Sequence, residues 1–493
     1  MKKKSKKKKS KKEARLFREN LGPSDWLSLS KNSYDFFLRY DSIILFIGLF
    51  IAYNTVSGVG LISGDIAPAT FLPISLLTDH NLFFDWATSY YSSPDFAYAF
   101  PFVNGHYVSL FPIVTPILIT PIYGISFYLS NLFSVSMGVK EICILAKSSA
   151  SIVAALAGVI FYLTGKKIFS RKIAIFTTFI FAFATSTWSI SSQALWQHGI
   201  AELFLITMVY LIVKNDRKEW WGYVFLLGVL SGLYIFNRPP DFILLIPVLI
   251  FVAIYQRSKI YYFLTGGIIS GLPFLYYNIS IFGNIFGGYA TNLTLFTLSM
   301  KFTQNFIGML FAPNVGLFIF CPILLLSILG YVNVYNSVDS KIKTLLLLFG
   351  PIIILQILMY CLFFWVSSVF CYGPRYLTDF IPILSLYTGF FLADWFGPAN
   401  IRQSNQKKLI VTIIIWGFVI SSVFIQFIGV FLYPWSSNQN QTVNADRAWN
   451  WSDSIIMNSI VLGSKEMPGI FVFTLPPLPP LGEYLFHQAS PKG

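Results

Sequence analysis

The chain has 493 residues, of which 55% are hydrophobic and only 11% are charged. A soluble chain of this length carries roughly 25% charged residues on the surfaces of its domains, so an ordinary soluble enzyme is excluded. The formal net charge is +14, but residues 1–19 alone contribute +9 of it. The basicity therefore belongs mostly to a tail, and it predicts no nucleic-acid partner.

The N-terminal tail, residues 1–40, begins MKKKSKKKKSKK. We expect it to be disordered, because such a run is too charged and too poor in apolar residues to pack. It acts either as a cytoplasmic topology determinant or as a ligand for anionic membrane lipids, at about 1 kcal/mol per basic residue near the surface. A secretory signal is excluded because the next apolar run is long and many similar runs follow.

Apolar stretches long enough to cross about 30 Å of hydrocarbon recur along the chain. They lie within 42–64, 148–165, 173–198, 220–237, 242–256, 260–300, 302–338, 344–374, 380–393 and 409–445. This pattern predicts an all-α polytopic membrane protein with 11 to 13 transmembrane helices. The transmembrane module covers residues 41–432, and a short extracytoplasmic tail covers 433–493.

Basic clusters between the runs predict the orientation of the chain. They lie at 166–172, 214–218, 257–259, 341–343 and 402–408, and the positive-inside rule makes them cytoplasmic together with the N-terminus. The alternate connections then face outward: a large first loop at 61–107, and shorter ones at 196–199, 237–241, 283–306 and 373–376. Within 96–139, prolines at near-helical spacing permit a re-entrant segment or two short spans.

Soluble-cofactor and metal motifs are not evident in the sequence. The four cysteines have no CxxC spacing, so neither a disulfide framework nor a zinc site is indicated. No phosphate-binding glycine motif appears, which excludes a recognisable nucleotide site. We expect no cofactor and no divalent metal ion.

The first outer loop holds four aspartates and no lysine or arginine. Asp65 comes directly after the first span, at the membrane–water boundary, where partial desolvation favours proton uptake by a carboxylate and suits it to general-base work. The alternative is that Asp65 caps the helix that begins near Pro68. Asp85 and His106 in this loop, and Tyr289 in the 283–306 loop, are candidate positions for binding the acceptor or the sugar.

Two arginines lie at outer ends of apolar runs, Arg238 in NRPPD and Arg375 in YGPRYLTDF. An unpartnered guanidinium at membrane depth costs roughly 2.5–3.5 kcal/mol, so each arginine should have an anionic partner. That partner is either a nearby carboxylate, Asp241 or Asp379, or a phosphate gripped by the guanidinium fork. His198 and Tyr376 could complete a site for a lipid-linked phosphate.

Several segments together resemble a known family. In chain order they are SGDIAPATFLPISLL, NGHYVSLFPIVTPILITPIYG, GKKIFSRK, WQHG, NRP, YNISIFGNIFGGY, FAPNVGLFIFCPILLL and YGPRYLTDFIP. They are similar to the GT-C membrane glycosyltransferases, in the branch of protein mannosyltransferases and lipid A aminoarabinose transferases. The resemblance implies a polyprenyl-phosphate sugar donor, an acceptor on the outer face that is a protein, a lipid or a glycan, and a catalytic role for Asp65.

The resulting hypothesis is an inverting transfer in which Asp65 is the general base. Arg375, assisted by Arg238, His198 and Tyr376, would bind the donor phosphate. The alternative is a transporter or flippase for a lipid-linked sugar, which should show intramembrane charges near the midplane and internal half-repeats. The sequence shows neither feature.

Overall fold

The computed structural model describes residues 40–55, 63–86, 97–135, 137–214, 220–290, 302–337, 339–362, 371–397, 405–433 and 445–463. The chain divides into two compact units, Met1–Gly48 and Leu49–Gly493. Every candidate site residue belongs to the second unit. The predicted basic tail lies outside the described residues except for Tyr40, as does most of the predicted C-terminal tail.

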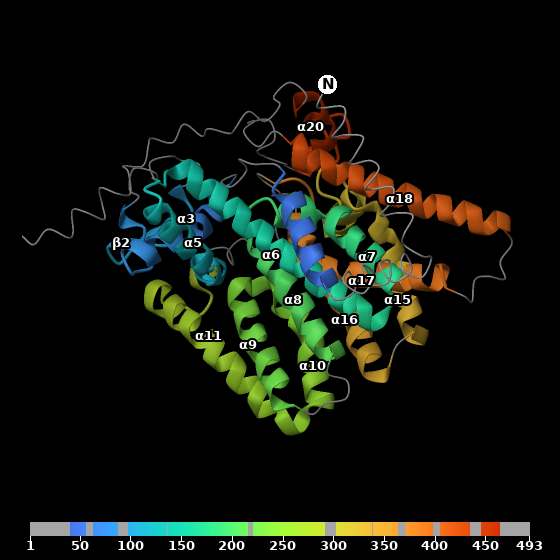
Figure 1. The fold of residues 1–493 in the computed structure, drawn as a ribbon, viewed down its shortest axis with the longest axis horizontal. Helices are drawn as coiled ribbons and strands as arrows, with labels where there is room; N and C mark the ends of the chain where they lie inside the picture. The colour runs from blue at the N-terminus through green and yellow to red at the C-terminus, as the bar shows by residue number, and fades with distance from the viewer. Residues whose placement is uncertain are drawn as a thin grey trace, which may run out of the picture. The chain divides into compact units, whose positions relative to one another are not determined.

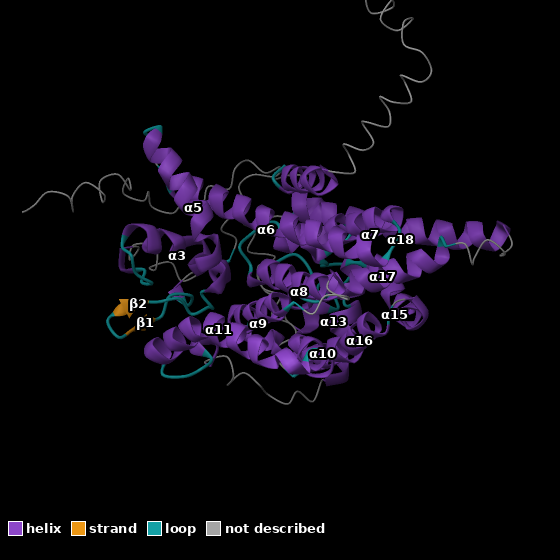
Figure 2. Cartoon of the chain, turned by 60° about the horizontal axis from the view of Figure 1, so that its bottom comes forward, coloured by secondary structure: helices purple, strands orange, loops and turns teal. Residues whose placement is uncertain are grey.

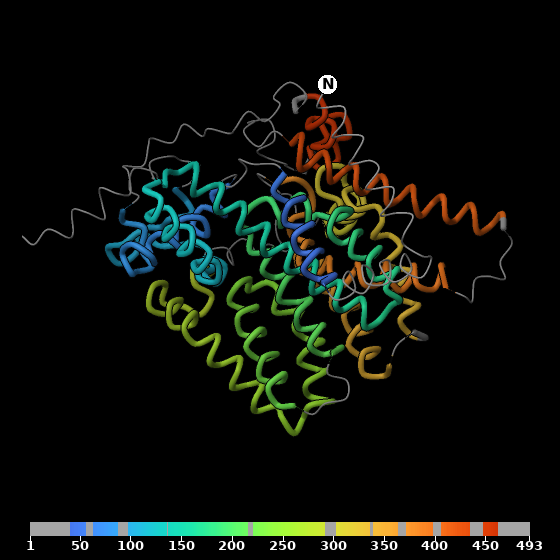
Figure 3. The backbone as a smooth tube through the Cα atoms, in the orientation of Figure 1, coloured from blue at the N-terminus to red at the C-terminus, as the bar shows by residue number. Residues whose placement is uncertain are grey.

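The second unit is built almost entirely of helices (Figures 1 and 3). In chain order they include α3 (Ala67–Thr78), α5 (Val114–Leu132), α6 (Val139–Ile168), α7 (Arg171–Phe183), α8 (Gln197–Lys214), α9 (Trp221–Asn237), α10 (Ile246–Tyr255), α11 (Ile260–Phe282), α13 (Phe302–Phe311), α14 (Leu317–Phe320), α15 (Leu326–Ser337), α16 (Ser340–Cys361), α17 (Ile381–Trp395), α18 (Asn405–Phe431), α19 (Ala445–Ala448) and α20 (Ile455–Gly463). The strands described are β1 (Phe102–Val103) and β2 (His106–Tyr107), an antiparallel hairpin that pairs Phe102 with Tyr107 (Figure 2).

The apolar helices confirm a multi-pass membrane protein. Among the described residues, four helices are long and apolar enough to cross a membrane, namely α6, α8, α16 and most of α18. A bent pair, Pro239–Tyr255 with Arg257–Phe282, meets at 102° and would be a fifth. Shorter apolar helices lie beside them, including α9 and α17. The total of 11 to 13 spans counts the whole chain and stays a prediction.

Helix α18 shows why such a helix needs a lipid environment. Many of its large apolar side chains are exposed, including Ile413, Ile420 and Phe424. In water this surface would be an aggregation site, whereas in a bilayer it contacts acyl chains at no such cost.

Helices α9 and α11 pack against each other through glycines. A Cβ at Gly228 of α9 would lie 2.0 Å from the carbonyl oxygen of Phe263, and one at Gly232 would lie 2.5 Å from that of Gly267. These residues form a GxxxG pattern, which allows two helix backbones to approach closely where lipid gives no hydrophobic drive for association. The packing fixes the end of α9, from which Arg238 follows.

A polar segment interrupts the helices between α7 and α8. It contains a π-helix, Thr187–Ser191, and its serines and threonines are buried. Lys147 of α6 donates to the carbonyl oxygen of Ser192 at 2.8 Å, and Glu202 of α8 accepts from Ser191 at 3.0 Å. Both charged residues are buried within candidate spans. The expectation that no charge lies near the membrane midplane stays a prediction.

The segment around α5 resolves one alternative. A single helix, Val114–Leu132, contains both Pro116 and Pro121, so this region does not form two short spans. Helix α5 packs on α3, where Tyr123 donates a hydrogen bond to the carbonyl oxygen of Thr70. Together these two helices support the turn that carries Asp65.

Candidate functional site

Asp65 lies in a 3-10 turn, Gly64–Ile66, that leads into α3. The Ser63 side chain accepts a hydrogen bond from the Asp65 backbone nitrogen and so caps the turn. Helix α3 begins after Ile66 and has no side-chain cap. Asp65 therefore does not cap the helix, and its carboxylate is available for other contacts.

The Asp65 carboxylate forms an ion pair with Arg375, whose Nη1 lies 2.7 Å from Asp65 Oδ2. Arg375 comes from a 3-10 turn, Arg375–Leu377, just before α17, and it is only 5% exposed. The sequence left two partners open for Arg375, a nearby carboxylate or a phosphate. The nearby carboxylate would have been Asp379. The structure shows instead a carboxylate from the other end of the chain.

Aromatic rings enclose the guanidinium of Arg375. It lies over Trp196, 4.6 Å from the ring centroid, and over Tyr376 at 5.1 Å. Its Nη2 also donates to the Tyr376 hydroxyl at 3.2 Å. Within the described residues its Nε is buried and has no hydrogen-bond partner. The guanidinium therefore has at least one donor, Nε, that no described residue uses.

Tyr98 contacts the other oxygen of the Asp65 carboxylate. Its hydroxyl donates to Asp65 Oδ1 at 2.5 Å, and the residue is 46% exposed. Burial of the phenol, followed by the charge of Asp65, raises the pKa of Tyr98 well above the ordinary value. Tyr98 is therefore a neutral hydrogen-bond donor at physiological pH.

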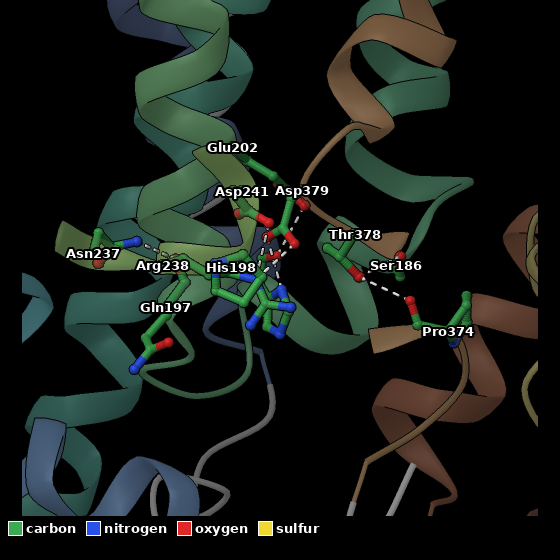
Figure 4. Close-up of polar contacts among 12 residues, drawn as sticks. Ser186, Gln197, His198, Glu202, Asn237, Arg238, Asp241, Pro374, Thr378 and Asp379 are labelled. Carbon is green, nitrogen blue, oxygen red and sulfur yellow. Dashed lines mark hydrogen bonds and ion pairs between the residues drawn. The ribbon is translucent and has the colours of Figure 1, made fainter. Parts of the chain in front are cut away.

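Arg238 and His198 meet at a second carboxylate, Asp379 (Figure 4). Arg238 Nε lies 2.9 Å from Asp379 Oδ2, and His198 Nδ1 lies 2.7 Å from Asp379 Oδ1. Arg238 also contacts Asp241 Oδ1 at 3.3 Å, as the sequence spacing suggested. All four side chains are buried, and they come from α8, from the α9 end and from the segment before α17.

This second cluster is braced by α16. The Tyr360 hydroxyl accepts from Arg238 Nη2 at 2.8 Å and donates to Asp241 Oδ1 at 3.2 Å. Burial raises the pKa of Asp379, but the charges and hydrogen bonds of Arg238 and His198 outweigh burial, so the pKa of Asp379 lies below its ordinary value. The cluster favours an ionised Asp379.

Tyr376 joins the two clusters. The Arg375 guanidinium lies 5.1 Å from the centroid of the Tyr376 ring, and the Arg238 guanidinium lies 5.8 Å from the same centroid. Tyr376 also packs near Tyr360, with ring centroids 5.7 Å apart. The structure thus brings Asp65, Arg375, Tyr376, Arg238 and His198 into one connected group.

Tyr289 lies at the edge of this group. It belongs to a short 3-10 turn, Gly287–Tyr289, and its hydroxyl donates to Gln197 Oε1 at 3.0 Å, one residue before His198. Its ring packs edge-on against Phe111, which in turn packs edge-on against Tyr98. A row of aromatic rings therefore connects Asp65 to Gln197.

Asp85 and His106 form a separate pair beside the hairpin. His106 Nδ1 lies 2.6 Å from Asp85 Oδ2, and both side chains are nearly half exposed. Asp85 Oδ1 also accepts from the Tyr107 backbone nitrogen at 2.9 Å, and Phe83 stacks on the His106 ring. None of the hydrogen bonds described for this pair reaches Asp65 or Arg375. Their predicted role in acceptor or sugar binding stays a prediction.

Metal binding has no clear location in the described part of the chain. There, no group of three or more His, Cys, Asp or Glu side chains could hold a metal ion. The expectation that the protein needs no metal ion rests on the sequence and stays a prediction.

Four residues of the group were missed or misassigned from sequence. Trp196 and Tyr360 were not singled out, Tyr98 was not considered, and Asp379 was considered only as a partner of Arg375. Trp196 directly precedes the QHG motif, so its position was a usable signal. Tyr98 and Tyr360 carried no such signal, because 27 tyrosines are spread through the chain.

No protein-family model matches the chain, and no curated protein sequence matches it. Solved structures do match. ArnT from Cupriavidus metallidurans bound to undecaprenyl phosphate has a TM-score of 0.50 and 12% identity, over 86% of this chain and 70% of ArnT. The Archaeoglobus fulgidus oligosaccharyltransferase tethered to an acceptor peptide has a TM-score of 0.48 and 13% identity, over 80% of this chain.

The chain spans 56% of the length of that archaeal enzyme. The likeness to ArnT shows the fold, and it confirms the resemblance noted from sequence: the chain has the GT-C fold of membrane glycosyltransferases. 

Proposed function

We propose that this chain, a membrane protein with the GT-C fold, is a glycosyltransferase. It moves a monosaccharide from a polyprenyl-phosphate donor to an acceptor, with inversion at the anomeric carbon. The acceptor is a hydroxyl or amide of a protein, a lipid or a glycan. The site faces the extracytoplasmic side of the cell membrane, and the N-terminus is cytoplasmic.

The observation that carries this proposal is the ion pair between Asp65 and Arg375. A carboxylate is the form of Asp65 that accepts a proton, and it is this form that pairs with Arg375. The same guanidinium keeps a buried Nε donor without a partner in the described residues. A candidate base and a candidate phosphate ligand therefore lie next to each other in one site, where each could act on one face of a bound sugar phosphate.

The reaction is a single displacement. The acceptor oxygen or nitrogen attacks the anomeric carbon while Asp65 takes its proton, and the bond from that carbon to the phosphate oxygen breaks. The leaving polyprenyl phosphate gains negative charge, which the buried guanidinium of Arg375 stabilises at low local dielectric. The products are the glycosylated acceptor and polyprenyl phosphate, and no soluble cofactor or metal ion takes part.

Arg238 and His198 are assigned a supporting part in phosphate binding. Asp379 already takes the Nε of Arg238 and the Nδ1 of His198, so a phosphate would use other nitrogen atoms of these side chains. Arg238 also packs against the Tyr376 ring, at 5.8 Å from its centroid, and so helps to hold that ring in place. Loss of either should weaken donor binding less than loss of Arg375.

The fold agrees with this chemistry. ArnT, whose fold this chain shares, was solved bound to undecaprenyl phosphate. We take the same class of lipid as the donor here because Arg375, whose Nε has no partner among the described residues, suits a lipid phosphate at the membrane boundary.

A transporter of a lipid-linked sugar is the competing function, and the buried Lys147 and Glu202 are the observation in its favour. Their partners argue for a structural role. Lys147 donates to the carbonyl oxygen of Ser192 and to the Ser151 hydroxyl, and Glu202 accepts from Thr187 and Ser191. Both side chains therefore pair with hydrogen-bonding groups of the polar segment before α8. This segment leads to Trp196 and His198.

The test uses purified protein in proteoliposomes with synthetic polyprenyl-phosphate monosaccharides, in a panel of hexoses and pentoses. Glycerol serves as a probe acceptor, and polyprenyl phosphate release is followed by ³¹P NMR. The proposal predicts release that depends on Asp65. Movement of the intact sugar lipid across the bilayer without cleavage would instead support a transporter.

A further inference from the structure

We infer that the hydroxyl of Tyr98 occupies the position on Asp65 that the acceptor takes in the reaction, so that the acceptor must displace Tyr98 to react. The inference rests on the proposed function, because it assumes that Asp65 is the base.

Both oxygens of the Asp65 carboxylate have partners. Oδ2 accepts from Arg375 at 2.7 Å, and Oδ1 accepts from the Tyr98 hydroxyl at 2.5 Å. The Arg375 contact holds the carboxylate in place. We assign proton transfer to Oδ1, the oxygen that does not bind Arg375, and Tyr98 holds this oxygen.

The hydrogen bond from Tyr98 to Asp65 resembles the one that an acceptor hydroxyl would form before proton transfer. A general base must lie within hydrogen-bond distance of the proton that it removes, and an acceptor hydroxyl would donate to the carboxylate as the phenol does. The phenol itself keeps its proton, because burial and the charge of Asp65 raise its pKa. Tyr98 thus mimics an acceptor without reacting as one at physiological pH.

Tyr98 is also the more exposed of the two partners of Asp65. Arg375 is 5% exposed, whereas Tyr98 is 46% exposed and Asp65 keeps 26% of its side chain exposed. Of the two side chains that bind the Asp65 carboxylate, Tyr98 is therefore the one that solvent reaches more easily. The ring packs edge-on against Phe111, with centroids 6.4 Å apart, which is compatible with a swing to one side.

Because Gly64 has no side chain, it leaves room for the Tyr98 phenol. A Cβ at residue 64 would lie 2.6 Å from Cε1 of Tyr98 and 2.7 Å from its hydroxyl oxygen. These atoms are the far end of a side chain that can rotate, so Gly64→Ala should be accommodated by movement of Tyr98 rather than of the backbone. The substitution therefore offers a way to move the phenol from Asp65 without removing it.

The experiment compares the wild type with Tyr98→Phe, Gly64→Ala and the double variant, each as the full purified chain. Initial rates of polyprenyl phosphate release are measured with the donor from the panel above, with glycerol as the probe acceptor and with water alone. Tyr128→Phe is the matched control, because Tyr128 is 69% exposed on α5.

The inference predicts that Tyr98→Phe lowers the glycerol KM about tenfold and leaves kcat within about twofold, because the competing hydrogen bond is gone. Gly64→Ala should shift KM in the same direction, and the double variant should match Tyr98→Phe. Release with water alone should also rise. Tyr128→Phe should behave as the wild type.

Results that contradict the inference about Tyr98 can be distinguished from failure of the proposed function. An active wild type in which Tyr98→Phe raises the KM or lowers kcat tenfold would show that Tyr98 binds the acceptor or positions Asp65, and would overturn the inference alone. An unchanged KM would also overturn it. A wild type that releases no polyprenyl phosphate from any donor would overturn the proposed function, and the inference with it.

Discussion

Asp65 and Arg375 are separated by 310 positions in the chain, yet their side chains meet at 2.7 Å. The pair joins the turn before α3 to the turn before α17, and it is surrounded by Trp196, Tyr376 and Tyr98. Arg375 binds the proposed base and keeps an Nε donor that could bind a phosphate. It would therefore link proton removal from the acceptor to stabilisation of the leaving phosphate.

Arg375→Lys should lower kcat/KM for the donor at least tenfold. A lysine keeps the charge but loses the planar fork, the packing on Trp196 and the Nε donor. Arg257→Lys is the matched control, because Arg257 is exposed and lies in the turn between α10 and α11, with no described contact to a site residue. Donor binding measured by fluorescence with a labelled lipid checks the result, and equal affinity in Arg375→Lys and the wild type would refute the assignment of Arg375 to the phosphate.

Asp379→Asn should destabilise the protein at neutral pH. Removing one member of a buried ion pair costs about 3–5 kcal/mol, and here both Arg238 and His198 lose their carboxylate. We expect a lower Tm than for the wild type and for Asp79→Asn, which changes an exposed aspartate at the end of α3.

The same pair predicts a pH dependence. The pKa of Asp379 is lower in the folded protein than its ordinary value near 3.9, so its stabilising effect is complete above that pH and is lost below it. The Tm difference between the wild type and Asp379→Asn should therefore be constant from pH 7 to 5 and shrink below pH 4. A difference that grows on acidification would contradict this assignment.

Gly228→Ala should destabilise the α9–α11 pair by about 1–3 kcal/mol. The new methyl group would overlap the carbonyl oxygen of Phe263, and two backbones would have to separate. Gly417→Ala in α18 is the control, because a Cβ at Gly417 meets nothing within 4 Å. Thermal unfolding in the same detergent compares them, and equal Tm values would show that the close approach does not matter for stability.

Chelation should leave transfer unchanged. The proposed reaction places the leaving phosphate on Arg375 rather than on a metal ion. We expect the same rate before and after treatment with EDTA, and the same rate after addition of Mg²⁺ or Mn²⁺. A loss with EDTA that either metal restores would show that a cation takes part.

Much of the fold could be predicted from sequence, because long apolar runs and breaks between them follow from the thickness of the bilayer. The segments around Asp65, His198, Arg238, Arg375 and Tyr376 were all expected on one side, and the structure places these five residues in one connected group. Their grouping follows from turns at helix ends that the fold brings together.

Apart from the contact between Arg238 and Asp241, the pairing of the charged residues could not be predicted. Arg375 and Asp379 are four positions apart, which made them plausible partners, but each pairs with a distant residue instead. Partner choice depends on which helix ends pack together, and helix α9 reaches its position through the glycine contacts with α11. Buried charges such as Lys147 were also missed, because one lysine in a long apolar run does not show which way it points.

The most direct measurement is sugar transfer by purified Asp65→Asn. The account predicts a loss of at least about a hundredfold in kcat, the lower limit for removal of a general base, while affinity for the donor lipid changes by less than about threefold. Asp79→Asn should keep full activity. A folded Asp65→Asn that transfers sugar at the wild-type rate would show that Asp65 is not the base.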